Sequence, residues 1–218
     1  MSTELYCSLK DLHARHGARE FGKIVQKLLA ISFRLAGFDR VVERGVQGVD
    51  VDAVGDPGER YATEVKTTQK DAVHFATKDI NGLAARQQDD YHPLLAVLRL
   101  APLSDLFLVH TATLRCGRLQ IASLRPYRFH ELERRLQPCF LQAVLAHFEG
   151  TLTGSQFYLD RVLREHDIQV SDLGSSLAAG PTTGDGEQRN MQSRRRPGGR
   201  WEEGRSLAAW VKRSASET

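Results

Sequence analysis

One segment, residues 48–66 (GVDVDAVGDPGERYATEVK), constrains the fold of this 218-residue chain more than any other. It contains two runs typical of β-strands, separated by a turn rich in glycine and proline. Side chains alternate between the two faces of a strand, so Glu64 and Lys66 project on one side and Val65 on the other. Pairing of the two strands through the turn predicts that Asp50 lies close to Glu64 at a strand end.

This pair of acidic side chains indicates a cation site. Two carboxylates at close range repel each other strongly unless a cation lies between them. A hard divalent cation such as Mg²⁺ prefers oxygen ligands and usually keeps bound water. With Lys66 beside the ion, the pattern fits hydrolysis of a phosphodiester bond, in which the metal activates water and the ammonium group stabilises negative charge.

The flanking sequence alternates between helical and β-like patterns. Residues 17–36 carry apolar side chains at helical spacing up to a break at Gly37. The elements expected from such patterns are a helix at 17–36, strands at 41–42, 49–54 and 61–67, a helix at 77–89, strands at 94–100 and 105–114, helices within 128–149 interrupted near Pro138, and a helix at 155–167. This order predicts an α/β fold.

The succession of helix, aspartate strand, turn and Glu-x-Lys strand resembles the PD-(D/E)xK nuclease superfamily, and most closely the archaeal Holliday-junction resolvases. The resemblance covers roughly residues 15–110, about half of the chain. It assigns catalysis to Glu20, Asp50, Glu64 and Lys66. It assigns metal binding to Glu20, Asp50 and Glu64, with the main-chain carbonyl of Val65 as a further ligand. Arg44 and Gly45 look like the basic, glycine-containing loop that lies near the scissile phosphate in such resolvases.

The resemblance implies a restriction-endonuclease-like α/β/α core with a central mixed sheet of about four or five strands. It also implies an endodeoxyribonuclease that uses Mg²⁺ or Mn²⁺, acts as a homodimer and cuts branched or structured DNA. A restriction-type or repair endonuclease on duplex DNA is the first alternative. The second is a nucleic-acid-binding module without cleavage.

Several simpler interpretations stay open at this point. Glu64 and Lys66 fit a solvated charge pair on one strand face equally well if taken alone. Glu20 fits an ordinary helix-surface acid near an N-terminus. Asp52 shares a strand face with Asp50 and competes with it as a metal ligand, although Asp50 fits the family position better. The family's proline before the aspartate is Val49 here.

The charge distribution divides the chain. Residues 174–218 contain eight basic and five acidic side chains, an excess that equals the whole net charge of +3. The part before them is formally neutral, so any DNA-binding surface there depends on how its charges are arranged. We expect a nuclease domain at 1–150, a packing helix within 151–173, and a disordered basic tail at 174–218 with a short helix at 201–213.

Two further groups of basic residues are candidates for DNA contacts. Lys70 follows the Glu-x-Lys strand, and an ordinary wet surface explains it equally well. In the tail, Arg194, Arg195 and Arg196 suit a polyanion through counterion release, with a solubilising tail as the even alternative. The three cysteines are far apart and match neither a disulfide framework nor a zinc site. With no apolar membrane span or secretory signal, we expect a cytoplasmic protein.

Overall fold

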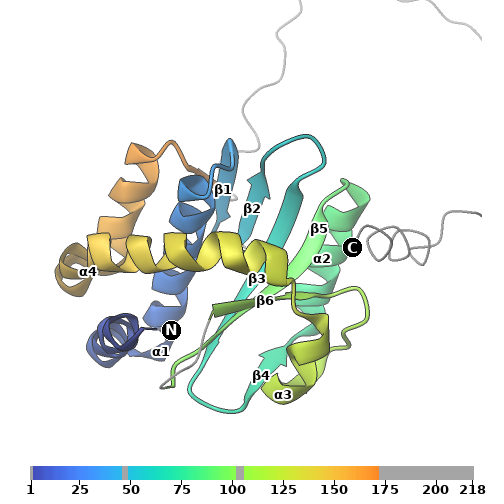
Figure 1. The fold of residues 1–218 in the computed structure, drawn as a ribbon, viewed down its shortest axis with the longest axis horizontal. Coiled ribbons are helices and arrows are strands. Elements are labelled where there is room, and N and C mark those ends of the chain that lie inside the picture. The colour runs from blue at the N-terminus through green and yellow to red at the C-terminus, as the bar shows by residue number, and fades with distance from the viewer. Residues whose placement is uncertain (1, 46–48, 102–105, 172–218) are drawn as a thin grey trace, which may run out of the picture. The chain divides into compact units, whose positions relative to one another are not determined.

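The structure, a computed structural model, describes residues 2–45, 49–101 and 106–171 (Figure 1). Its helices are α1 (Thr3–Leu35), α2 (Thr77–Gln88), α3 (Ile121–Leu124) and α4 (His130–Glu165), with one 3₁₀ turn at Arg125–Tyr127. Its strands are β1 (Arg40–Arg44), β2 (Val51–Val54), β3 (Arg60–Thr68), β4 (Ala72–Phe75), β5 (His92–Arg99), β6 (Leu106–His110), β7 (Gly117–Gln120) and β8 (Gln169–Ser171).

Six of these strands form one mixed sheet in the order β6-β5-β3-β2-β1-β8. The chain β1-β2-β3 runs as an antiparallel meander, whereas β3 pairs parallel with β5 through the α2 crossover. Strands β4 and β7 form a separate two-stranded ribbon. The predicted α/β fold with a central mixed sheet is thus confirmed, with six strands in that sheet rather than four or five.

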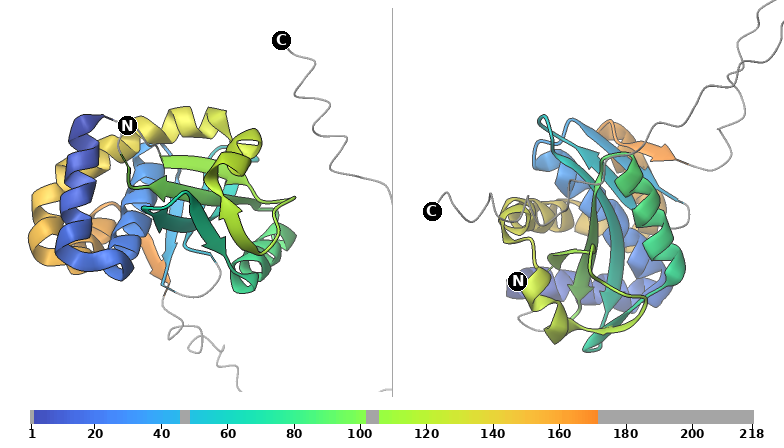
Figure 2. Two further views of the ribbon diagram at one scale, coloured as in Figure 1. Left: turned by 90° about the horizontal axis from the view of Figure 1, so that it is seen from below. Right: turned by 90° about the vertical axis from the view of Figure 1, so that its right-hand side faces the viewer.

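Helices cover both faces of the sheet, as Figures 1 and 2 show. On one face α1 and α4 pack on apolar side chains such as Val51 and Ala53 of β2. On the other face α2 packs through Leu83 against Ala62 of β3 and its neighbours. Because side chains alternate along each strand, every second residue faces the α2 layer. Glu64 and Lys66 therefore belong to the α2 face.

The two long helices differ from the expected pattern. Helix α1 begins at Thr3, fourteen residues before the predicted start, and is kinked at Gly17, whose φ of 75° suits a residue without a side chain. Helix α4 continues through Pro138, because Leu136 and Phe140 on either side are buried against α1 and the sheet. Its kink lies instead at Ser155, so the helix predicted at 155–167 is the second arm of α4.

Four short elements, β4, β7, α3 and β8, were not predicted. They are three or four residues long, too short to show a periodic pattern. All described residues lie within one compact unit, Met1–Ala179, and the expected domain boundary at residue 150 falls inside α4. The tail expected at 174–218, with the short helix expected at 201–213, lies outside the described residues. No helix that the structure describes has an apolar stretch long enough to cross a bilayer.

Candidate active site

Asp50 lies where β2 and β3 begin to separate. Strand β2 starts at Val51, which pairs with Thr63 of β3, and the amide of Asp50 donates to the Thr63 carbonyl at 3.0 Å. Beyond this point β2 offers no ladder partner to β3. The amide of Val65 donates instead to Oδ2 of Asp50 at 2.7 Å. The Asp50 carboxylate is thereby fixed beside the main chain of the Glu-x-Lys segment.

Glu64 is a buried carboxyl group, and Asp50 is a half-buried one beside it. The Glu64 residue is only 5% exposed, and its Oε2 has no hydrogen-bond partner. Burial raises the pKa of Glu64 to about 8, with a further contribution from the charge of Asp50 and an opposing one from Lys66. Burial also raises the pKa of Asp50 to about 6, against the hydrogen bond from Val65. Both groups therefore resist ionisation in the absence of a cation.

Lys66 is held by two carboxylates. Its Nζ lies 2.6 Å from Oε1 of Glu64 and 2.7 Å from Oδ2 of Asp79. Burial lowers the pKa of Lys66, but the two acids outweigh this effect and hold it above its ordinary value. Lys66 is therefore an ammonium group across the physiological pH range.

Asp79 was not identified from the sequence. It comes from the first turn of α2, where its Oδ2 also accepts a hydrogen bond from the amide of Ala76 at 2.9 Å. Burial raises the pKa of Asp79, but the bonds from Lys66 and Ala76 hold it below its usual range. An acid at the third position of the predicted helix that follows the Glu-x-Lys strand is the signal that could have revealed it.

The residues present fit a hard divalent cation. The side chains that meet here offer carboxylate oxygens, the ligands that Mg²⁺ prefers, and a divalent cation beside them would oppose the burial that raises the pKa values of Asp50 and Glu64. Oε2 of Glu64 and Oδ1 of Asp79 are buried without hydrogen-bond partners. Within the described ranges, no three His, Cys, Asp or Glu side chains are grouped to surround an ion. Asp50 and Glu64 are the carboxylates that would hold the ion.

Glu20 lies apart from this group. It projects from α1 toward α4, where its carboxylate accepts a hydrogen bond from Ser155. It is not among the charges that act most strongly on Asp50 or Glu64. The structure thus brings together Asp50, Glu64 and Lys66 but not Glu20, whose catalytic role stays a prediction.

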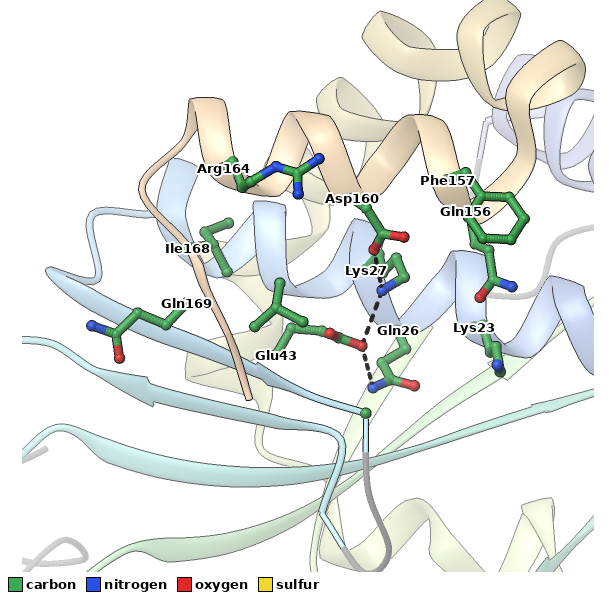
Figure 3. A pocket seen from close by; sticks show the side chains of 12 residues that line it. Lys23, Gln26, Lys27, Glu43, Gln156, Phe157, Asp160, Arg164, Ile168 and Gln169 are labelled. Carbon is green, nitrogen blue, oxygen red and sulfur yellow. Dashed lines mark hydrogen bonds and ion pairs between the residues drawn. The ribbon is translucent and has the colours of Figure 1, made fainter. Parts of the chain in front are cut away.

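A polar network on the α1 side of the sheet reaches the main chain of Asp50. Gln26 of α1 donates to Oε1 of Glu43 at 2.7 Å and to the carbonyl of Asp50 at 3.3 Å. Lys27 bridges Glu43 and Asp160 of α4 at 3.3 and 2.7 Å, as Figure 3 shows. These side chains line a pocket of about 930 Å³ between α1, β1, α4 and β8. Through Gln26, the network links α1 to the main chain directly before β2.

Asp52 is engaged in ion pairs and is not placed to compete with Asp50. It is 1% exposed, and its Oδ2 lies 2.6 Å from Nε of Arg44 and 2.7 Å from a guanidinium nitrogen of Arg86 in α2. Arg86 also stacks on the ring of Tyr91 at 4.1 Å. The guanidinium of Arg44, predicted to lie near the scissile phosphate, is thus bound to Asp52 in this structure.

We expect Asp52→Asn to lower the free energy of unfolding by on the order of 2 kcal/mol, because it removes the shared anion between two arginines. Urea denaturation measures this loss. Mg²⁺ affinity, measured by calorimetry, should be retained in Asp52→Asn and lost in Asp50→Asn. The reverse pattern of Mg²⁺ binding would make Asp52 the ligand.

Of the remaining residues predicted to contact DNA, some lie within the described ranges and some outside them. Lys70 is exposed in the turn after β3, on the path from Lys66 to β4. Gly45 lines the pocket of Figure 3, next to residues 46–48, which lie outside the described ranges. Arg194, Arg195 and Arg196 also lie outside them. Their assignment to DNA binding stays a prediction.

Comparison with known proteins finds similarity in structure but none in sequence. No family model and no curated protein matches the sequence. Among solved structures, the chain is similar to Hjc, a Holliday junction resolvase from the archaeal hyperthermophile Archaeoglobus fulgidus, with 14% identity and a TM-score of 0.43. The match covers 52% of this chain and 95% of that chain.

Proposed function

We propose that this chain is a metal-dependent endodeoxyribonuclease that hydrolyses phosphodiester bonds in branched DNA. The observation that carries the proposal is the cluster of Asp50, Glu64 and Lys66, in which a buried and a half-buried carboxyl group, both with raised pKa values, lie beside one ammonium group. A solvated charge pair is the simpler alternative, but Glu64 is only 5% exposed. Burying such groups costs stability, and a catalytic site is a common reason for keeping them.

The chain's own groups divide the chemistry between them. A Mg²⁺ or Mn²⁺ ion held by Asp50 and Glu64 would polarise a phosphoryl oxygen and acidify a bound water. Lys66, already charged, balances the negative charge that develops on the phosphoryl oxygens during attack. The amide of Val65 keeps the Asp50 carboxylate oriented, so little reorganisation is needed. The Val65 carbonyl and Glu20 remain proposed as further ligands.

Exposed basic side chains next to the site suit a DNA backbone. Lys70 and Lys78 lie on the segments that leave β3 and enter α2, and His74 faces Arg118 across the β4–β7 ribbon. Basic side chains of this kind gain affinity for phosphates by releasing counterions. Resolution of a branched molecule needs two cuts, so we propose a homodimer in which each copy contributes one centre.

The test is incubation of the purified protein with a labelled four-way junction and a linear duplex of matched sequence, each with Mg²⁺ and with EDTA. We expect Mg²⁺-dependent, symmetric cutting of the junction. Lys66→Ala should reduce this activity to a slow residual rate, whereas Lys10→Ala, which changes an exposed lysine on α1, should retain the full rate.

The outcomes separate the candidate functions. If the protein cuts the duplex into discrete products but leaves the junction intact, the hydrolytic mechanism stands and the substrate is duplex DNA. The protein would then act as a restriction-type or repair enzyme. DNA binding without cleavage under any metal, unchanged by Asp50→Ala, would replace the nuclease by a binding module.

A further inference from the structure

Asp79 belongs to the catalytic centre by contact but lies outside the motif. Its carboxylate is 2.7 Å from Nζ of Lys66, and its side chain is 1% exposed. One of its oxygens, Oδ1, is buried without a hydrogen-bond partner. A helix-capping role accounts for the bond from the Ala76 amide, but it does not require burial against a lysine from another element.

We propose that Asp79 positions Lys66 for the hydrolytic reaction, an inference that rests on the proposed nuclease function. A lysine side chain is a flexible four-carbon stem, and holding its ammonium in one place costs conformational entropy. Glu64 alone is a poor anchor, because its carboxylate also has to serve as a metal ligand. Asp79 supplies the second anchor and keeps Lys66 in place when Glu64 is engaged elsewhere.

The anchor itself is rigid. Asp79 is fixed at the first turn of α2 by the 2.9 Å bond from the Ala76 amide. Helix α2 is in turn held on the sheet by Leu83, which is 2% exposed, and by the ion pair between Arg86 and Asp52. The position of the Lys66 ammonium is therefore set by the packing of α2 as well as by β3.

The test separates positioning from helix capping with a double-mutant cycle. Asp79→Asn keeps the size of the side chain and an acceptor for the Ala76 amide but removes the charge that holds Lys66. We expect its single-turnover cleavage rate to fall about 10- to 100-fold, the scale of a misplaced catalytic group. Its affinity for DNA, measured by fluorescence anisotropy in EDTA, should be unchanged. In a Lys66→Ala background the same substitution should change the residual rate less than about twofold.

Two further variants control for stability and charge. Ala84→Gly changes an exposed position of α2 and weakens the helix by about 1 kcal/mol without touching the site, so its rate should equal that of the wild type. Asp79→Glu retains the negative charge, so its cleavage rate should be faster than that of Asp79→Asn. This comparison keeps the proposal testable if Asp79→Asn folds poorly. Urea unfolding of the four proteins of the cycle gives the coupling between Asp79 and Lys66 without any measurement of activity.

A wild-type rate in Asp79→Asn would overturn the positioning role, as would an equal loss of rate with and without Lys66. Equal losses in Asp79→Glu and Asp79→Asn would also count against it. In each of these cases the wild-type protein still cuts DNA and the proposed function stands. Absence of cleavage by the wild-type protein would instead remove the proposed function, and this inference with it.

Discussion

Glu64→Gln is expected to reduce cleavage by on the order of a thousandfold or more, equivalent to ~4 kcal/mol of transition-state stabilisation, and also to stabilise the metal-free protein at alkaline pH. The first effect follows from loss of a charged metal ligand. The second follows from the raised pKa of Glu64, about 8 in the folded protein. A carboxyl group of this kind contributes stability below its unfolded pKa, and that stability is lost as the pH rises through the folded value. A glutamine is neutral at every pH and avoids the loss.

The measurement is urea unfolding in EDTA at pH 5 and pH 9, beside single-turnover cleavage with Mg²⁺. The variant should be more stable than the wild type at pH 9 and similar to it at pH 5. Glu133→Gln is the matched control, because Glu133 is 3% exposed but accepts hydrogen bonds from the Leu108 amide and from Arg128. We expect this control to lose stability and keep cleavage. A Glu64→Gln protein that is less stable at pH 9, or that still cuts DNA, would contradict the assignment.

The Gln variants of Glu64 and Glu133 are expected to change stability in opposite directions. The difference reflects a trade-off between stability and activity. Glu133 is buried with its hydrogen bonds made, so it supports the fold. Glu64 is buried beside a second acid, and one of its oxygens has no hydrogen-bond partner. It therefore lowers the stability of the metal-free protein. Sites of this second kind are typical of catalytic centres.

Local patterns were sufficient to predict the hairpin that carries the site. The alternation of side chains along β3 placed Glu64 and Lys66 on one face, and the turn brought Asp50 beside them, as the structure has it. The sequence could not show that Asp79 would join them, because that contact depends on how α2 packs on the sheet. Contacts between separate elements carry no periodic signal along the chain.

The helical pattern of residues 17–36 likewise predicted the arm of α1 after Gly17 but not which of its side chains reach the site. Glu20 lies within three residues of the kink at Gly17, which the spacing of apolar residues did not reveal. Its side chain meets Ser155 of α4, which lies 135 positions further along the chain. On the same helix, Gln26 is the residue that reaches the main chain of Asp50. Glu20 and Gln26 are six positions apart, which is more than one turn of the helix. The position of Glu20 in the motif was therefore not enough to predict which side chain contacts Asp50.

Mg²⁺ affinity is expected to rise about tenfold for each pH unit between pH 6 and pH 8, because one proton must leave the site for each ion bound. In this window Asp50, with a pKa of about 6, is mostly ionised, whereas Glu64, with a pKa of about 8, still carries its proton. Below pH 6 both carboxyl groups hold protons, so the dependence should steepen toward a hundredfold for each pH unit. Above pH 8 it should level off.

Calorimetric titration with Mg²⁺ in two buffers of different ionisation enthalpy counts the protons directly. We expect about one proton released at pH 7 and nearly two at pH 5.5, from the two carboxyl groups. In Glu64→Gln the residual affinity should no longer depend on pH between 6 and 8, because the group that titrates there is gone. Asp52→Asn should retain the wild-type pH dependence of Mg²⁺ affinity, because Asp52 is engaged in ion pairs with Arg44 and Arg86. Binding that releases no proton at pH 7 would mean that the ion bypasses Glu64, and the cation would then have to be assigned to other oxygen ligands.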